Sequence, residues 1–95
     1  MTSGVELSRS LMMMHPADNV AVCLRALSAG EEIPVTLNEK TLSVKVCESI
    51  PLGHKVALSC IEQGQAIVKY GEIIGRATRE ILVGQHVHSQ NVTDY

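Results

Sequence analysis

Residues 50–67, IPLGHKVALSCIEQGQAI, contain two copies of one short pattern: an apolar residue, two variable residues, a glycine, two variable residues and a second apolar residue. The copies are Ile50–Val56 and Ile61–Ile67. In our interpretation the first apolar residue ends a short strand and points inward. The next two residues make a turn, which the glycine closes at a positive φ angle. The second apolar residue then begins the next strand.

Outside this stretch the pattern occurs twice more, at Leu27–Ile33 and Ile81–Val87. We therefore expect four glycines in turns: Gly30, Gly53, Gly64 and Gly84. Short alternating segments rich in β-branched residues are found at Val20–Leu24, Val35–Leu37, Leu42–Val46 and Lys55–Leu58, and they favour strands. No stretch predicts a long helix. The fold class is all-β, a small clip-like or barrel-like domain with short strands and many turns.

The chain has 95 residues, which fits one domain. Residues 1–14 show neither a strand pattern nor turn chemistry, so we interpret them as a flexible N-terminal arm and residues 15–95 as the domain. The apolar run Leu11–Met14 is too short for a signal peptide or a membrane helix.

The composition excludes several classes of partner. There are two Tyr, no Phe and no Trp, so the core is aliphatic and no aromatic platform exists for nucleic-acid bases. The net charge of −2 predicts neither nucleic-acid binding nor a basic membrane patch. Cys23, Cys47 and Cys60 form no C-x-x-C pair and have apolar neighbours. We interpret them as buried free thiols in a reducing, cytoplasmic compartment.

Residues 15–92 resemble a known family. Its opening motif is similar to His15–Ala21 and its middle motif to Ile50–Leu58, while Ile67–Ala77 and Gly84–Ser89 resemble its closing half. This family is the SAF-type β-clip domain of altronate and galactarate dehydratases, and the small subunit of sulfolactate sulfo-lyase is built similarly. Family members often end in His-Val-His-x-His-Asn, but here Gln90 replaces the third histidine.

The resemblance implies a small subunit of a sugar-acid dehydratase, inactive alone, whose large catalytic partner supplies most of the active site. Such enzymes take the proton next to a carboxylate and expel the β-hydroxyl, which requires an acid, a base or a metal. The implied cofactor is Fe(II) or another divalent cation, held mainly by the partner, and the implied substrate is a hydroxy-carboxylate. A homo-oligomer is left open.

Histidines are the best candidates for this chemistry. His86 and His88 are two residues apart on an expected strand, so they share a face and could line a cleft or bind one metal. His15 precedes Pro16 at an extended entry to the first strand, and we expect it to lie near the other two. His54 follows a turn glycine, and we expect it to be a solvent-exposed turn residue.

The candidate substrate-binding residues are Asp18, Asn19, Lys55 and Arg76. Asp18 and Asn19 could bind a hydroxylated ligand or only satisfy their own turn. Lys55 could meet a carboxylate or be a solvated charge. Arg76 could hold a carboxylate in a bidentate manner, or pair with Glu72 or Glu80.

Three other functions remain as alternatives. The chain could be the small subunit of a sulfolactate-type sulfo-lyase, or a non-enzymatic SAF module for ligand binding or assembly. A biotinyl or lipoyl carrier is disfavoured, because neither Val44-Lys45-Val46 nor Val68-Lys69-Tyr70 has the flanks of a modified lysine.

Overall fold

The four repeated patterns form four similar turns. A computed structural model describes residues 10–94, and in it the predicted turn glycines all have positive φ angles: Gly30 94°, Gly53 86°, Gly64 85° and Gly84 87°. The first apolar residues of the repeats pair in isolated bridges, Leu27 with Ile50 and Ile61 with Ile81. This part of the sequence-based prediction is therefore confirmed.

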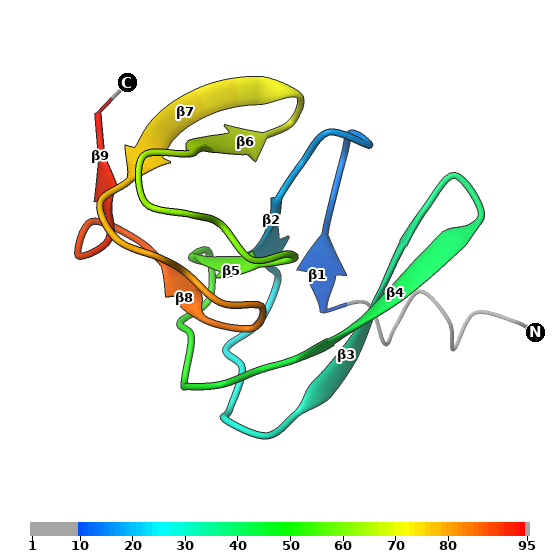
Figure 1. The fold of residues 1–95 in the computed structure, drawn as a ribbon. Helices are drawn as coiled ribbons and strands as arrows, with labels where there is room; N and C mark the ends of the chain where they lie inside the picture. The colour runs from blue at the N-terminus through cyan, green and yellow to red at the C-terminus, as the bar shows by residue number, and fades with distance from the viewer. Residues whose placement is uncertain (1–9, 95) are drawn as a thin grey trace, which may run out of the picture.

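Nine short strands connect these turns, and the described residues contain no helix, so the predicted all-β class is confirmed. They are β1 (Leu11–Met12), β2 (Val20–Cys23), β3 (Glu32–Leu37), β4 (Lys40–Lys45), β5 (Lys55–Ala57), β6 (Ala66–Lys69), β7 (Glu72–Ala77), β8 (His86–Val87) and β9 (Val92–Thr93). All strand pairs are antiparallel, in three sheets of order β1-β2-β5-β8, β3-β4 and β6-β7-β9. Figure 1 shows the first sheet between the β3–β4 hairpin and the β6-β7-β9 sheet.

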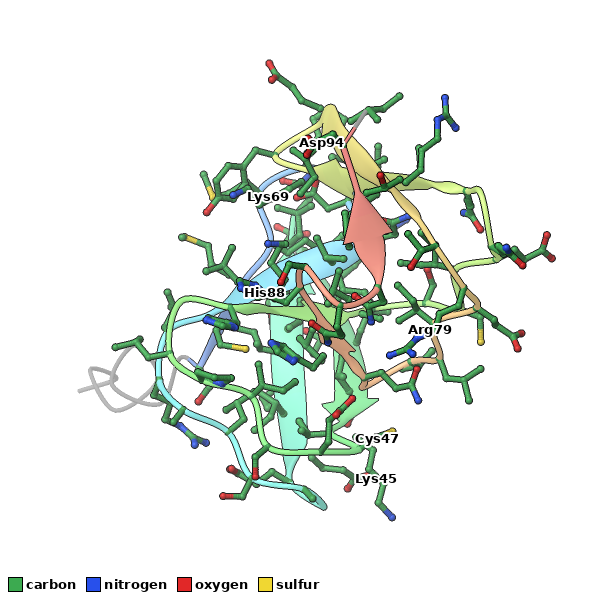
Figure 2. All side chains as sticks on the ribbon, turned by 90° about the vertical axis from the view of Figure 1, so that its left-hand side faces the viewer. Lys45, Cys47, Lys69, Arg79, His88 and Asp94 are labelled. Carbon is green, nitrogen blue, oxygen red and sulfur yellow. The ribbon has the colours of Figure 1, made fainter. Side chains whose placement is uncertain are left out.

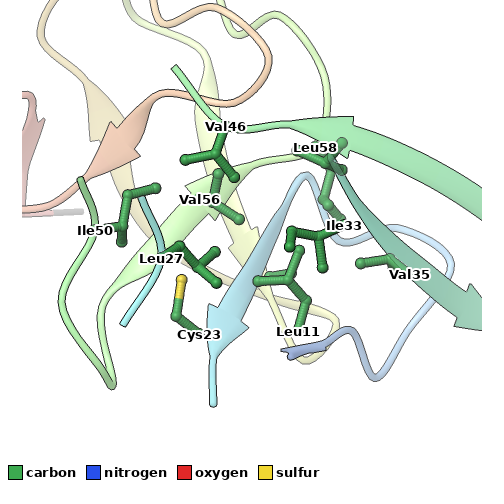
Figure 3. Close-up of a cluster of buried hydrophobic side chains, with 11 residues drawn as sticks. Leu11, Cys23, Leu27, Ile33, Val35, Val46, Ile50, Val56 and Leu58 are labelled. Atoms are coloured by element: carbon green, nitrogen blue, oxygen red, sulfur yellow. The ribbon is translucent and has the colours of Figure 1, made fainter. Parts of the chain in front are cut away.

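Two aliphatic cores lie on the two faces of the sheet β1-β2-β5-β8. The first core (Figure 3) includes the apolar residues of the first two repeats, Leu27, Ile33, Ile50 and Val56, and the second core includes those of the last two, Ile61, Ile67, Ile81 and Val87. All eight side chains are at most 4% exposed. Val56 and Ala57 are adjacent in β5, and their side chains point to opposite faces of the sheet, Val56 into the first core and Ala57 into the second. This alternation is the period-2 geometry of a strand. Each pair of repeats thus builds one core.

The fold begins earlier than the boundary at residue 15 that turn chemistry predicted. Leu11 pairs with Cys23, is 4% exposed and belongs to the first core, so β1 is part of the domain. A strand of two residues is too short to show alternation, which is why the sequence pattern missed it. The remainder of the expected arm, residues 1–9, lies outside the described residues.

The cysteines differ from the expected set of buried thiols. Cys23 is buried, and burial raises the pKa of its thiol to about 11. Cys47 and Cys60 are exposed: both lie outside the strands, and each has an apolar residue on one side only, Val46 and Ile61. Nothing in residues 10–94 forms an apolar helix of the length that crossing a bilayer requires.

Candidate functional site

Three histidine rings stack at one end of the β5–β8 pair. Val56 pairs with His86, so the antiparallel register places residue 54 opposite residue 88. The ring centroids of His54 and His88 are 3.9 Å apart, those of His54 and His86 5.1 Å, and those of His86 and His88 5.5 Å. The expected shared face of His86 and His88 is confirmed. We call the three residues the histidine stack.

The backbone of this stack is fixed by side chains from two loops. A Glu48 carboxylate oxygen accepts the backbone N–H of His86 at 3.0 Å. The amide of Asn91, which is 3% exposed, donates to the carbonyl of His86 at 2.8 Å and accepts the backbone N–H of His88 at 3.0 Å. Both flanking peptide groups are therefore held in place, and the rings project from a rigid support.

The surroundings of His86 and His88 favour their uncharged forms. Burial, followed by the neighbouring His54, lowers the pKa of His86. The pKa of His88 is lowered by burial, His54 and Lys55. A neutral imidazole has a lone pair that can accept a proton or bind a metal, so these shifts suit either role.

Lys55 adds a positive charge beside the stack. It pairs with Val87, the residue between His86 and His88, and it is half-buried. Burial and the nearby Lys69 lower its pKa. No carboxylate in residues 10–94 forms an ion pair with Lys55. In Figure 2, Lys69 and His88 lie one above the other on this side of the molecule.

The donor set of the stack fits a divalent transition metal. The three imidazoles each offer a ring nitrogen, and these atoms lie within 4.8 Å of one another. The rings are nearly parallel, however, with interplanar angles of 9° to 19°. Because an imidazole lone pair lies in the plane of its ring, stacked rings do not aim at one point, and coordination requires at least one ring to rotate.

His15 is not a member of the stack. It lies in a turn between β1 and β2 rather than before the first strand, and its ring packs against Gly71 in the β6–β7 turn. A Cβ atom at Gly71 would lie 2.8 Å from the His15 ring, so the contact depends on that glycine. The part of the chain that is described therefore brings together His86 and His88 but places His15 elsewhere, and its catalytic role stays a prediction.

Asp18 and Asn19 connect the same turn to the β6–β7 hairpin. The buried Asp18 carboxylate accepts backbone N–H groups of Met14 and His15 at 3.1 Å and of Gly71 at 2.8 Å. The amide of Asn19 donates to the Ala66 carbonyl and accepts the Val68 N–H. These hydrogen bonds give both side chains a structural role, and substrate binding by them stays a prediction.

Arg76 lies on β7, away from the stack in the strand order. Its guanidinium donates to the carbonyl of Gly64 at 3.2 Å, a partner that the sequence did not indicate. Binding of a substrate carboxylate by Arg76 stays a prediction.

Sequence reasoning missed His54, which we expected to be an exposed turn residue. It is half-buried, and its Nδ1 lies 2.8 Å from Nε2 of His86. Strand β5 ends the second repeat and strand β8 ends the fourth. Aligning these two strands as an antiparallel pair could have found His54, since their register sets position 54 opposite position 88. Glu48 carried no recognisable sequence pattern, whereas Asn91 is the last residue of the family's His-Val-His-x-His-Asn motif, in which only the histidines had been considered.

Comparison with known proteins gives one family and consistent relatives. Residues 9–95 match the family model described as the altronate/galactarate dehydratase SAF domain. The chain is 39% identical over 83 residues to altronate dehydratase of Bacillus subtilis, covering 87% of this chain and 16% of that protein. It is 33% identical over 84 residues to the (2R)-sulfolactate sulfo-lyase subunit alpha of Chromohalobacter salexigens, covering 84% of this chain and 89% of that protein. Galactarate dehydratase of Escherichia coli is 38% identical over 81 residues, with 14% of its length covered. The chain thus spans about one sixth of the dehydratases that it matches and most of the sulfo-lyase subunit.

Proposed function

Because the chain belongs to the altronate/galactarate dehydratase SAF domain family, we propose that it is the small subunit of a sugar-acid dehydratase. In this proposal it lends the histidine stack to an active site that a larger catalytic subunit completes. The observation that carries the proposal is the meeting of three half-buried imidazoles with a half-buried Lys55 that has no ion-pair partner among residues 10–94. The free thiols support a cytoplasmic location.

The proposed reaction breaks a C–H bond next to the carboxylate and the C–O bond of the β-hydroxyl, and it forms a C=C bond and water. The base must be neutral before it takes the proton, and the lowered pKa values of His86 and His88 favour that state. The ammonium of Lys55 would bind the substrate carboxylate, which would also supply its missing counter-charge. His15, Asp18, Asn19 and Arg76 remain further candidates for contacts with the substrate.

A divalent cation is the proposed cofactor, held mainly by the partner subunit. His54, His86 and His88 are the residues of this chain that would hold it. When bound, such a cation polarises a carboxylate or hydroxyl oxygen as a Lewis acid. The chain's own part is to present neutral imidazoles from a fixed backbone, which Glu48 and Asn91 secure.

A sulfo-lyase small subunit is the second candidate, and the likeness to a sulfo-lyase subunit alpha favours it. The chain covers 89% of a protein named subunit alpha, but only 16% of the altronate dehydratase. Both candidates act on a carboxylate with a leaving group nearby, so the same stack serves either one. The substrate distinguishes them.

Reconstitution tests the proposal. The chain is purified alone and together with a larger catalytic chain of the altronate/galactarate dehydratase or sulfo-lyase type from the same organism, and both samples are assayed with altronate, galactarate and sulfolactate. We expect no turnover by the chain alone and turnover of one substrate by the pair. His88→Ala should lower kcat of the pair by about 10²-fold or more, as for loss of a general acid or base. Gln63→Ala, at an exposed turn position, is the control. Turnover by the chain alone, or full activity of His88→Ala, would contradict the proposal.

A further inference from the structure

Gln90 lies at the outer end of the histidine stack, where it contacts His86. The amide nitrogen of Gln90 is 3.2 Å from Nδ1 of His86, and Nε2 of His86 is 2.8 Å from Nδ1 of His54. The three side chains therefore form one hydrogen-bonded series, Gln90–His86–His54. Gln90 belongs to the turn His88–Asn91, which is closed by a hydrogen bond from the Asn91 N–H to the His88 carbonyl at 3.1 Å.

The orientation of the Gln90 amide, with its nitrogen toward His86, sets the direction of this series. A side-chain amide nitrogen only donates, so Nδ1 of His86 must accept. A neutral imidazole has one N–H and one lone pair, so the hydrogen of His86 is on Nε2 and is donated to Nδ1 of His54. His54 must then have its own hydrogen on Nε2.

We propose that Gln90 is a positioning residue that sets the tautomer of His86 and, through it, the tautomer of His54. Both rings are then Nε2–H tautomers, and His54 ends the series with an N–H donor. No hydrogen bond in residues 10–94 involves a ring nitrogen of His88. His88 is thus the imidazole of the stack whose lone pair is free for a substrate proton or a cation. Only this last step rests on the proposed function.

A side-chain amide can also accept a hydrogen bond, so Gln90 permits the opposite arrangement, in which Nδ1 of His86 has the hydrogen and donates it. When a histidine binds a metal through one nitrogen, the other nitrogen has the hydrogen and donates it to an acceptor. By rotating its amide, Gln90 would present Oε1 to Nδ1–H of His86. Gln90 therefore supports His86 with or without a bound metal, whereas a carboxylate only accepts and leucine does neither.

Two substitutions test the direction of the series. Gln90→Glu offers only acceptor atoms, so His86 should carry its hydrogen on Nδ1, and its Nε2 should accept from Nδ1–H of His54. One exposed substitution should thus reverse the tautomers of two rings. Gln90→Leu removes the hydrogen bond, and both rings should then populate both tautomers.

The measurement is nitrogen-15 NMR of the imidazole groups in the complete 95-residue chain, whose ring nitrogens have different chemical shifts with and without hydrogen. A pH of about 8.5 keeps histidines neutral, since the ordinary pKa is about 6.5. Gln63→Glu is the matched control, because it makes the same chemical change at an exposed turn position. A wild-type His86 with hydrogen on Nδ1, or tautomers unchanged in Gln90→Glu, would overturn the proposal.

A metal titration separates this proposal from the proposed function. Calorimetry with Zn²⁺ should show affinity about 10- to 100-fold weaker for Gln90→Leu than for the wild type, the usual loss when the outer partner of a ligand is removed. Equal Zn²⁺ affinity in the two proteins would overturn the role of Gln90 toward a metal. If neither protein binds Zn²⁺, the metal part of the proposed function fails, while the NMR result still decides the tautomers.

Discussion

Replacement of Gly84 by alanine should destabilise the fold much more than the same change at Gly64. Both glycines have φ angles near the left-handed region, 87° and 85°, so both variants share a backbone cost of about 1–2 kcal/mol. Lower entropy of the unfolded chain offsets about 0.4–1 kcal/mol of that cost. Gly64 has open space around the added Cβ, so its net loss should be about 1 kcal/mol.

The surroundings of Gly84 add a second cost. An added Cβ would overlap the carbonyl oxygen of Lys45 and lie 3.2 Å from Sγ of Cys47. The loop cannot move freely to relieve the overlap, because the Cys47 N–H donates to the Gly84 carbonyl at 2.9 Å. Overpacking of this kind costs about 1–3 kcal/mol, so Gly84→Ala should lose about 2–4 kcal/mol in total.

Thermal unfolding followed by far-ultraviolet circular dichroism measures the difference. For a domain of this size, each 1 kcal/mol corresponds to about 4–8 °C in Tm. Gly64→Ala should therefore melt about 4–8 °C below the wild type, and Gly84→Ala at least twice as far below it. Equal shifts in the two variants would show that the backbone conformation alone sets the cost, and our steric argument would be wrong.

Four further predictions concern the rest of the domain. Glu39→Gly should raise Tm by several degrees, because Asn38 and Glu39 form the two-residue β3–β4 turn at φ 53° and 70°, where Asn-Gly is favoured; an unchanged Tm would contradict this. A thiol reagent at neutral pH should label two cysteines quickly and Cys23 only after unfolding, and fast labelling of all three would refute its burial. Because the pKa of Cys23 rises from 9.0 to about 11, the unfolded chain loses this proton first, so the free energy of unfolding should fall as pH rises from 9 to 11, and in a Cys23→Ala variant this fall should be smaller. Asn91→Ala should cost about 1–3 kcal/mol in chemical denaturation, since it leaves a part-buried carbonyl and a part-buried N–H of the stack without their hydrogen-bond partner; a loss below about 0.5 kcal/mol would count against its supporting role, because that is about the size of an ordinary surface substitution.

The sequence by itself determined the turns, the all-β class and the shared face of His86 and His88. These features depend on neighbours within a few residues. A glycine between two apolar residues sets a turn through its own φ angle, and a spacing of two sets a face through the pleat of one strand. Local chemistry of this kind is written in consecutive residues, so it can be predicted without knowing where the chain goes next.

Only the tertiary structure decided the membership of the histidine stack. His54 and His86 are 32 positions apart, and they meet because β5 pairs with β8 in one particular register. The same long-range packing placed Leu11 in the core, left Cys47 and Cys60 exposed and set His15 against Gly71 instead of beside His86. Registers between distant strands depend on how the two cores are filled as a whole, and no short pattern in the sequence records that outcome.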